Sequence, residues 1–221
     1  TITGGSGTGA LAYSISSAGT AGCSVGASSG IVTPTTAGTC DIAITRAADT
    51  NYNISSTLTP TVTFAQASQS ALTTTAQTVT YPAAFSNAAT TGGSGTGAVT
   101  YALTSAGTAG CSVTSGGVIS YANAGTCTIT ATKAADTNYT SVSSAAQTFT
   151  VSKASQSSLI NVGASTTAWP ATLGLTITGG SGTGALAYSI SSAGTAGCSV
   201  GASSGIVTPT TAGTCDIAIT R

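Results

Sequence analysis

Large apolar residues alternate with threonine, serine and alanine along most of this chain. Val99, Tyr101 and Leu103 alternate with smaller residues, which predicts a strand with one buried face. The same period of two returns at residues 127–131 and 149–151. No segment repeats apolar residues at the helical period of 3.6. The pattern therefore predicts an all-β protein.

Turn residues separate these short segments. Gly, Pro, Asn and Asp interrupt the alternation at intervals of roughly 8 to 12 residues, and we count about seven strands in each repeat of the pattern. Such strands are typical of a two-layer antiparallel sandwich. We therefore predict immunoglobulin-like antiparallel β-sandwich modules.

The pattern also repeats at the level of whole modules. Residues 1–46 recur letter for letter as residues 176–221. A diverged copy lies between them, because Gly4, Gly92 and Gly179 open the same GGSGTG string, in steps of 92 − 4 = 88 and 179 − 92 = 87 residues. A period of this length exceeds the roughly 20–50 residues of a solenoid coil and matches a small domain with its own core.

Related strings at residues 66–68 (QAS) and 153–155 (KAS) suggest the module boundaries. We predict modules at residues 1–66, 67–154 and 155–221, the first truncated at its N-terminal side and the third at its C-terminal side. We expect a longer natural polymer, in which the missing strands come from the adjoining repeat in sequence. Short boundaries without a flexible Gly/Ser stretch indicate a defined orientation between successive modules.

Six cysteines occur as one pair in each copy. Even, repeating spacing favours disulfides, whereas a zinc site needs four ligands and each copy offers two thiols with no histidine. The bond runs either between sheets or within a hairpin, and we favour neighbouring segments around a hairpin. Disulfides persist outside the reducing cytosol, so we predict a secreted or cell-surface protein. The predicted pairs are Cys23 with Cys40, Cys111 with Cys127, and Cys198 with Cys215.

Charge and composition exclude several classes of function. With 4 basic and 4 acidic residues and no histidine, the chain lacks the clustered charge that nucleic-acid binding requires. No apolar run approaches the roughly 18 residues of a membrane span. Acid–base catalysis would depend on four aspartates that each fit a solvated strand or turn. We expect no enzyme activity, no catalytic residue and no cofactor.

The glycine-rich and aspartate-rich strings are predicted to be turns. The GGSGTG loops lack the GK[ST] string and the following helix of a phosphate-binding loop. Asp49 and Asp136 each begin an Asp-Thr-Asn turn, but one carboxylate per turn is few for calcium. We predict Asx-turns, in which the carboxylate accepts hydrogen bonds from nearby backbone N–H groups, and no metal site.

Two further sets of residues are candidate contact or modification sites. Tyr81-Pro82 and Trp169-Pro170 follow the predicted boundaries and are candidates for contacts between modules; in the alternative, each ring covers the core of its own module. Asn53 and Asn138 begin glycosylation sequons and are candidate sites for glycans.

Four strings of the central copy carry a resemblance: GGSGTGAVTYAL, AGTAGCSV, AGTCTITATKAADTNY and QTFTVSKASQ. They resemble the bacterial immunoglobulin-like (Big-type) tandem repeats of giant secreted or cell-surface proteins. The most specific element lies at residues 124–139, with its counterpart at 37–52, and the resemblance covers the whole chain. It implies an extracellular stalk, adhesin or filament, whose partners are adjacent repeats of the same polypeptide and identical chains in a fibre.

Two functions therefore compete. The first is a structural one, a semi-rigid spacer or fibre-forming array. The second is a surface-binding module for carbohydrate, a host surface or ice, motivated by Thr-x-Thr runs at residues 128–132 and 59–63. Threonine also has a high strand propensity, which accounts for these runs without a ligand.

Overall fold

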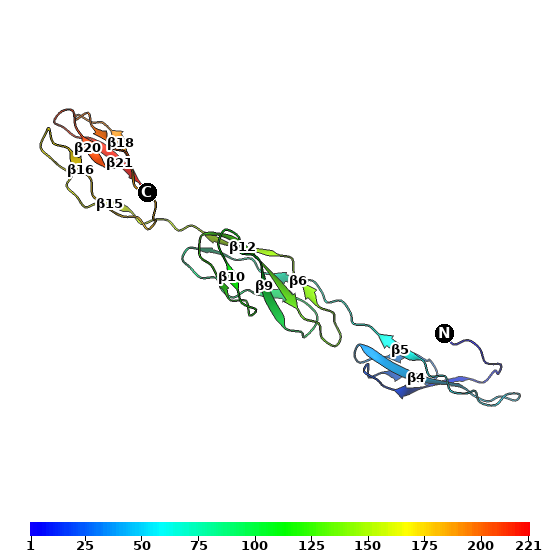
Figure 1. Ribbon diagram of the computed structural model, residues 1–221. Helices are drawn as coiled ribbons and strands as arrows, with labels where there is room; N and C mark the ends of the chain where they lie inside the picture. Colours follow the sequence, from blue (N-terminus) through cyan, green and yellow to red (C-terminus); the bar gives the residue numbers. More distant parts are fainter. The chain divides into compact units, whose positions relative to one another are not determined.

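The computed structural model describes all residues from Thr1 to Arg221 and contains strands but no helices. The chain divides into two compact units, Thr1–Lys153 (unit 1) and Ala154–Arg221 (unit 2), which are considered separately (Figure 1). Unit 1 contains two separate hydrophobic cores, one in the first copy of the repeat and one in the central copy. The three-module division at 66/67 and 154/155 stays a prediction. No helix in the structure is suited to cross a membrane.

The central copy contains a five-stranded sheet. Its longest strand, β12 (Gly125–Lys133), pairs along one edge with β9 (Val99–Ser105). Along its other edge, the first part of β12 pairs with β14 (Gln147–Ser152) and its last two residues pair with β13 (Val142–Ser143). The outermost strand is β7 (Thr78–Thr80), which pairs with β14. β14 lies between β12 and β7 because it pairs with both of them. The β7–β14 pair is parallel, and all other strand pairs are antiparallel.

Short strands form the second layer of the central copy. They pair as β6 (Leu72–Thr74) with β8 (Thr90–Gly92), and as β10 (Ser112–Val113) with β11 (Ile119–Ser120). Counting β6 with β7 and β13 with β14 as interrupted strands gives seven strand positions. The predicted fold class, immunoglobulin-like β-sandwich modules with one disulfide each, is confirmed.

The core of the central copy lies between these layers. Phe149 of β14 is fully buried, and its ring meets that of Phe85 edge to face with 5.7 Å between the centroids. The disulfide joins Cys111, just before β10, to Cys127 in β12. β10, which directly follows Cys111, pairs with β11 and not with β12. The disulfide therefore connects two different sheets. The β10–β11 hairpin lies between the two cysteines in sequence.

The first copy repeats part of this arrangement. In its three-stranded sheet, β4 (Gly38–Arg46) lies between β1 (Leu11–Ser17) and β5 (Thr61–Phe64). A separate hairpin pairs β2 (Ser24–Val25) with β3 (Val32–Thr33).

Unit 2 contains only two- and three-stranded sheets. Its strand β21 (Asp216–Thr220) pairs with β18 (Ala187–Ser192) and with no other strand. The remaining pairs are β15 (Leu159–Asn161) with β17 (Ile177–Gly179), and β20 (Ile206–Thr208) with both β16 (Leu173–Gly174) and β19 (Ser199–Val200). One edge of β21 is therefore open.

Candidate functional site

An aspartate closes the glycine-rich loop of the central copy onto the turn that follows β12. Oδ1 of Asp136 accepts hydrogen bonds from the backbone N–H groups of Asn138 and Tyr139, both at 2.9 Å. Its Oδ2 accepts from the backbone N–H of Thr96 at 2.5 Å and from the Thr96 hydroxyl at 3.2 Å. The predicted Asx-turn is confirmed. The GGSGTG loop thus presents a backbone N–H to an anion that belongs to the chain itself.

The first copy contains the same arrangement. Asp49 accepts from the backbone N–H groups of Thr8 (2.6 Å), Asn51 (2.8 Å) and Tyr52 (2.9 Å). These bonds, the one from Thr8 above all, stabilise the carboxylate and lower the pKa of Asp49 to about 2. The pKa of Asp136 is lowered in the same way, chiefly by the Thr96 backbone N–H. We call this feature the aspartate clamp.

Both carboxylate oxygens of each clamp already accept hydrogen bonds within the module. No group of three or more His, Cys, Asp or Glu side chains that could hold a metal ion occurs in the chain. The clamp therefore ties together two loops that lie 40 or 41 residues apart in sequence.

The boundary segment between the first and central copies is bonded to the same turn. The backbone N–H of Ala67 donates to the carbonyl of Asn138 at 2.8 Å, and the N–H of Thr140 donates to the carbonyl of Ala67 at 2.9 Å. Ala67 and Tyr139 form an isolated parallel bridge. The side-chain amide of Gln69 donates to the carbonyl of Thr140 at 2.8 Å. The segment is thus fixed to the central copy by its backbone.

Two hydrogen bonds join the two copies directly, and in one of them the side-chain amide of Gln66 donates to the carbonyl of Asp136. The backbone N–H of Ala37, in the loop before β4, donates to Oδ1 of Asn138 at 2.8 Å. Asn138 is half-buried, whereas Asn51, its counterpart in the first copy, is exposed. Together, the bonds of Ala67 and Asn138 form a bonded junction within unit 1, and this junction is the candidate functional site.

The two aromatic–proline pairs lie in different surroundings. Tyr81 packs edge to face against Tyr121 of its own copy, with 6.3 Å between the centroids, and is itself exposed. Trp169 is exposed and lines a groove within unit 2. The Tyr81–Pro82 and Trp169–Pro170 peptide bonds are both cis. A contact between modules through these four residues stays a prediction.

The two sequon asparagines differ in accessibility. Asn53 is exposed in the segment between β4 and β5. Asn138 is half-buried and its side-chain oxygen accepts the bond from Ala37. Glycans at these sites stay a prediction, for which Asn53 is the more accessible residue.

Sequence reasoning missed the partners in the junction. Ala37, Thr96 and Gln69 have no chemistry that singles them out, and their partners are distant in sequence. A signal existed for Gln69, because the SQS string at residues 68–70 returns at 155–157.

Comparisons with known proteins assign no family to the chain. No protein-family model matches it, and no curated protein matches it. Among solved structures, Drosophila N-cadherin EC1-4 is similar with 10% identity and a TM-score of 0.34, covering 99% of this chain and 64% of that one. Human protocadherin-24 EC1-2 matches with 12% identity and a TM-score of 0.33, covering 70% of this chain and 86% of that one. At this level the likeness assigns no function.

Proposed function

We propose that this chain is a structural repeat region of a long extracellular filament, stalk or adhesin, acting as a semi-rigid spacer or fibre-forming array. The observation that carries the proposal is the bonded junction within unit 1. Ala67 is held by two backbone hydrogen bonds, and Asn138 bonds directly to Ala37 of the preceding copy. A large rotation of the first copy relative to the central copy would break the Ala37–Asn138 bond, and the two bonds of Ala67 fix the start of the central copy.

The disulfides support an extracellular location. Each encloses a loop with a sequence separation of 16 or 17 residues. Closing such a loop stabilises a module by about 3 kcal/mol in the chain-entropy model. Bonds of this kind are retained where no reducing system removes them, as in secreted and surface proteins. Together with the four strings of the central copy, this supports membership of the bacterial immunoglobulin-like repeats.

Nuclear magnetic resonance relaxation of the full chain tests the spacer function. If the bonded junction restricts motion, backbone ¹⁵N relaxation of the folded parts of residues 1–66 and 67–153 will fit one common rotational diffusion tensor. Separate correlation times for the two segments in the wild-type chain would contradict the proposal.

A matched pair of variants examines the junction itself. Asn138→Ala removes the acceptor for the Ala37 N–H, so we expect the two segments to tumble more independently. Asn51→Ala changes the equivalent, exposed residue of the first copy and should leave the relaxation unchanged. Equal behaviour of the two variants would show that the Ala37–Asn138 bond does not restrict motion.

The outward threonines favour this structural function over surface binding. The hydroxyls of Thr104 and Thr130 bond each other at 2.6 Å, and those of Thr132 and Ser143 at 2.9 Å. These bonds join neighbouring strands, so the Thr-x-Thr run of β12 stabilises the sheet. A glycan array and an ice-shaping assay on the chain should accordingly give no signal.

A further inference from the structure

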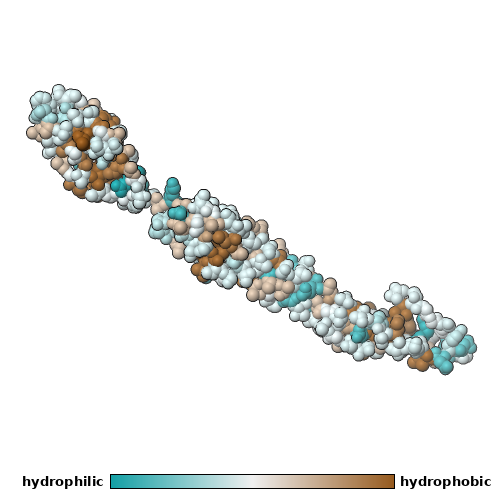
Figure 2. All heavy atoms as spheres, viewed as in Figure 1, coloured by the Kyte–Doolittle hydropathy of each residue, from teal (hydrophilic) through white to brown (hydrophobic).

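Polar contacts at the boundary decide how firmly the first and central copies are held to each other. The hydrophobic cores of these two copies share no residue. The chain has only 4 basic and 4 acidic residues, and most residues on the face in Figure 2 are neither strongly hydrophilic nor strongly hydrophobic. The bonded junction therefore depends on how well its few hydrogen-bonding groups are held in place.

The boundary segment, residues 66–69, is bonded to one turn of the central copy, residues 134–140, which we call the junction turn. Every second carbonyl of the junction turn accepts a hydrogen bond from this segment. The side-chain amide of Gln69 donates twice, to Ala134 at 3.0 Å and to Thr140 at 2.8 Å. The other two donors are the side chain of Gln66, to Asp136, and the backbone N–H of Ala67, to Asn138.

Gln69 also reaches the glycine-rich loop, residues 92–97. Its side chain is 9% exposed, and its Oε1 accepts from the backbone N–H of Gly95 at 3.3 Å. Asp136 holds the same loop through the N–H and the hydroxyl of Thr96. A Cβ atom at Gly95 would lie 2.5 Å from Oδ2 of Asp136, so this close approach requires a glycine. Gln69 and Asp136 thus connect the loop to the junction turn by separate hydrogen bonds.

The side chains of Gln69 and Asp136 make no hydrogen bond to the first copy. Oδ1 of Asp136 accepts from the backbone N–H of Asn138, and the side chain of Asn138 accepts from Ala37. The carboxylate therefore fixes the backbone from which the Asn138 side chain projects. Any effect of Asp136 on the bond to Ala37 is transmitted through the junction turn.

We propose that Asp136 and Gln69 are positioning residues of the bonded junction. They hold the junction turn against the closed glycine-rich loop, and this arrangement presents Asn138 to Ala37 and the turn carbonyls to the boundary segment. Opening of the loop releases the junction, so the stiffness between the two copies is set within the central copy. The inference rests on the proposed spacer function, in which the junction restricts motion.

Amide hydrogen exchange of the full chain, followed residue by residue by nuclear magnetic resonance, tests this role. The N–H groups of Ala37, Ala67 and Thr140 report the junction bonds themselves. Asp136→Asn keeps the shape of the side chain but replaces one acceptor oxygen with a donor. We expect the three N–H groups to exchange roughly tenfold faster, although the Asp136 side chain bonds to none of them.

Asp49→Asn is the matched control, because it makes the same change in the clamp of the first copy. Asp49 and Asp136 are both half-buried and accept corresponding hydrogen bonds. The Asp49 side chain holds no residue of the junction, so this variant should leave the exchange at Ala37 and Ala67 unchanged. Equal effects of the two substitutions, or no effect of Asp136→Asn, would overturn the proposal.

A second matched pair examines Gln69. Gln69→Glu keeps the acceptor for the Gly95 N–H and removes both donated bonds, so it should speed the same exchange. Gln77→Glu makes the same chemical change elsewhere in the central copy, where Gln77 donates to the carbonyl of Asn87 and accepts from the hydroxyl of Ser86. It should leave the junction unchanged. Equal exchange at the junction in both variants would show that Gln69 has only a general role in stability.

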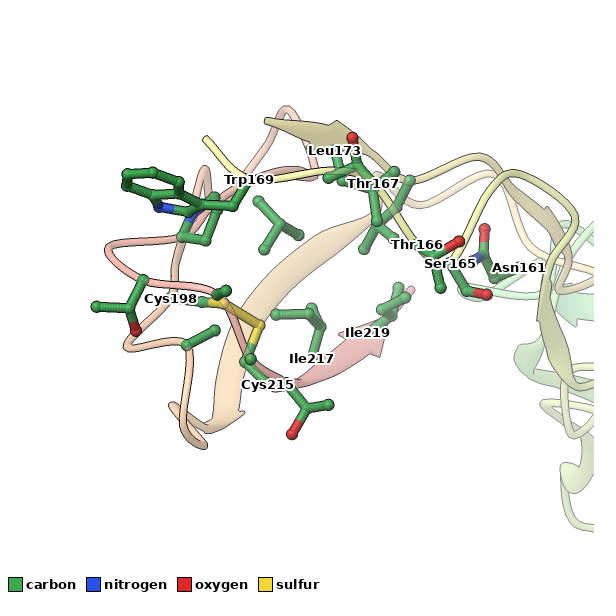
Figure 3. Close-up of a pocket in the computed structure, with 18 residues that line it drawn as sticks. Asn161, Ser165, Thr166, Thr167, Trp169, Leu173, Cys198, Cys215, Ile217 and Ile219 are labelled. Carbon is green, nitrogen blue, oxygen red and sulfur yellow. A yellow bond between two sulfur atoms is a disulfide. The ribbon is translucent and has the colours of Figure 1, made fainter. Parts of the chain in front are cut away.

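Trp169 provides a control for unit 2. It is the one tryptophan of the chain and lines a groove of unit 2 together with Cys198 and Cys215 (Figure 3). All four substitutions lie in unit 1, so Trp169 emission should stay constant. A change in emission for Asp136→Asn alone would contradict a role confined to the junction.

The relaxation measurement separates this inference from the spacer function. Independent tumbling of the first and central copies in the wild-type chain would count against the spacer function, whatever the exchange rates. Common tumbling together with unchanged exchange in Asp136→Asn and Gln69→Glu would overturn the positioning role alone.

Discussion

Residues 1–46 and 176–221 have the same sequence but do not bury the same side chains. Ile42 of the first copy is 2% exposed, and Cys40 and Ile44 are also buried, because β5 covers this part of β4. The counterparts Cys215, Ile217 and Ile219 in unit 2 are only half-buried. The burial of this segment in the first copy therefore depends on β5, which lies outside the repeated sequence.

The difference is reversed at the second layer. Val207 and Tyr188 of unit 2 are 6% and 8% exposed, whereas their counterparts Val32 and Tyr13 are only half-buried. In unit 2, β16 pairs with β20, and no equivalent strand pairs with β3 of the first copy. The repeated segment therefore determines its own strands and disulfide, while strands from outside it determine which of its residues become core.

The largest expected effect comes from the disulfides, which should stabilise both copies equally. The Cys23–Cys40 and Cys198–Cys215 bonds have the same sequence separation of 17. Replacing either pair with serine should lower the free energy of unfolding by about 3 kcal/mol. Urea unfolding followed by circular dichroism, with Trp169 fluorescence for unit 2, measures both losses. Very different losses would show that the loops are not equivalent.

Truncating an isoleucine of the central strand should affect the two copies unequally. Ile42→Ala creates a cavity in a closed core and should cost about 3 kcal/mol. Ile217→Ala changes a half-buried side chain at the groove and should cost about 1 kcal/mol. The same unfolding assay compares them. A larger loss for Ile217→Ala would contradict the difference in burial.

The opposite order is expected at the second layer. Val207→Ala should cost about 2 kcal/mol because Val207 is buried and pairs with Leu173 of β16 in the same sheet. Val32→Ala, at the half-buried counterpart, should cost about half as much. A general weakness of one unit could not produce this reversal. A difference in which strands pair with each copy does produce it.

The smallest effect concerns the aspartate clamp, which both copies in unit 1 contain. The pKa of Asp49 is lowered from 3.8 to about 2, so its contribution is complete above pH 4 and is lost as pH falls towards 2. Unit 1 should lose stability in this range. Asp49→Asn and Asp136→Asn together should remove most of this pH dependence, as measured by thermal unfolding; an unchanged profile would contradict the clamp.

The sequence predicted the strands because apolar alternation reports burial directly. Cys127, Ile129, Phe149 and Val151 were assigned to inward faces and are buried. Leu103 was also assigned inward but is exposed, near the irregular register at the end of the β9–β12 pair. Period alone cannot reveal where a pair becomes irregular.

The junction was beyond sequence reasoning. The partners of Asn138 and Asp136 lie 101 and 40 residues away, and hydrogen-bonding residues this common carry no signature of long-range pairing. Burial differences between identical segments cannot be predicted from those segments at all.

The position of the disulfides has a mechanical consequence. A force applied to the two ends of a module would have to pass through the Cys111–Cys127 bond, which bypasses the 16 residue steps between them. Fully extended, these would add about 50 Å of contour length. An unfolded module therefore extends by this further length only after its disulfide has been reduced.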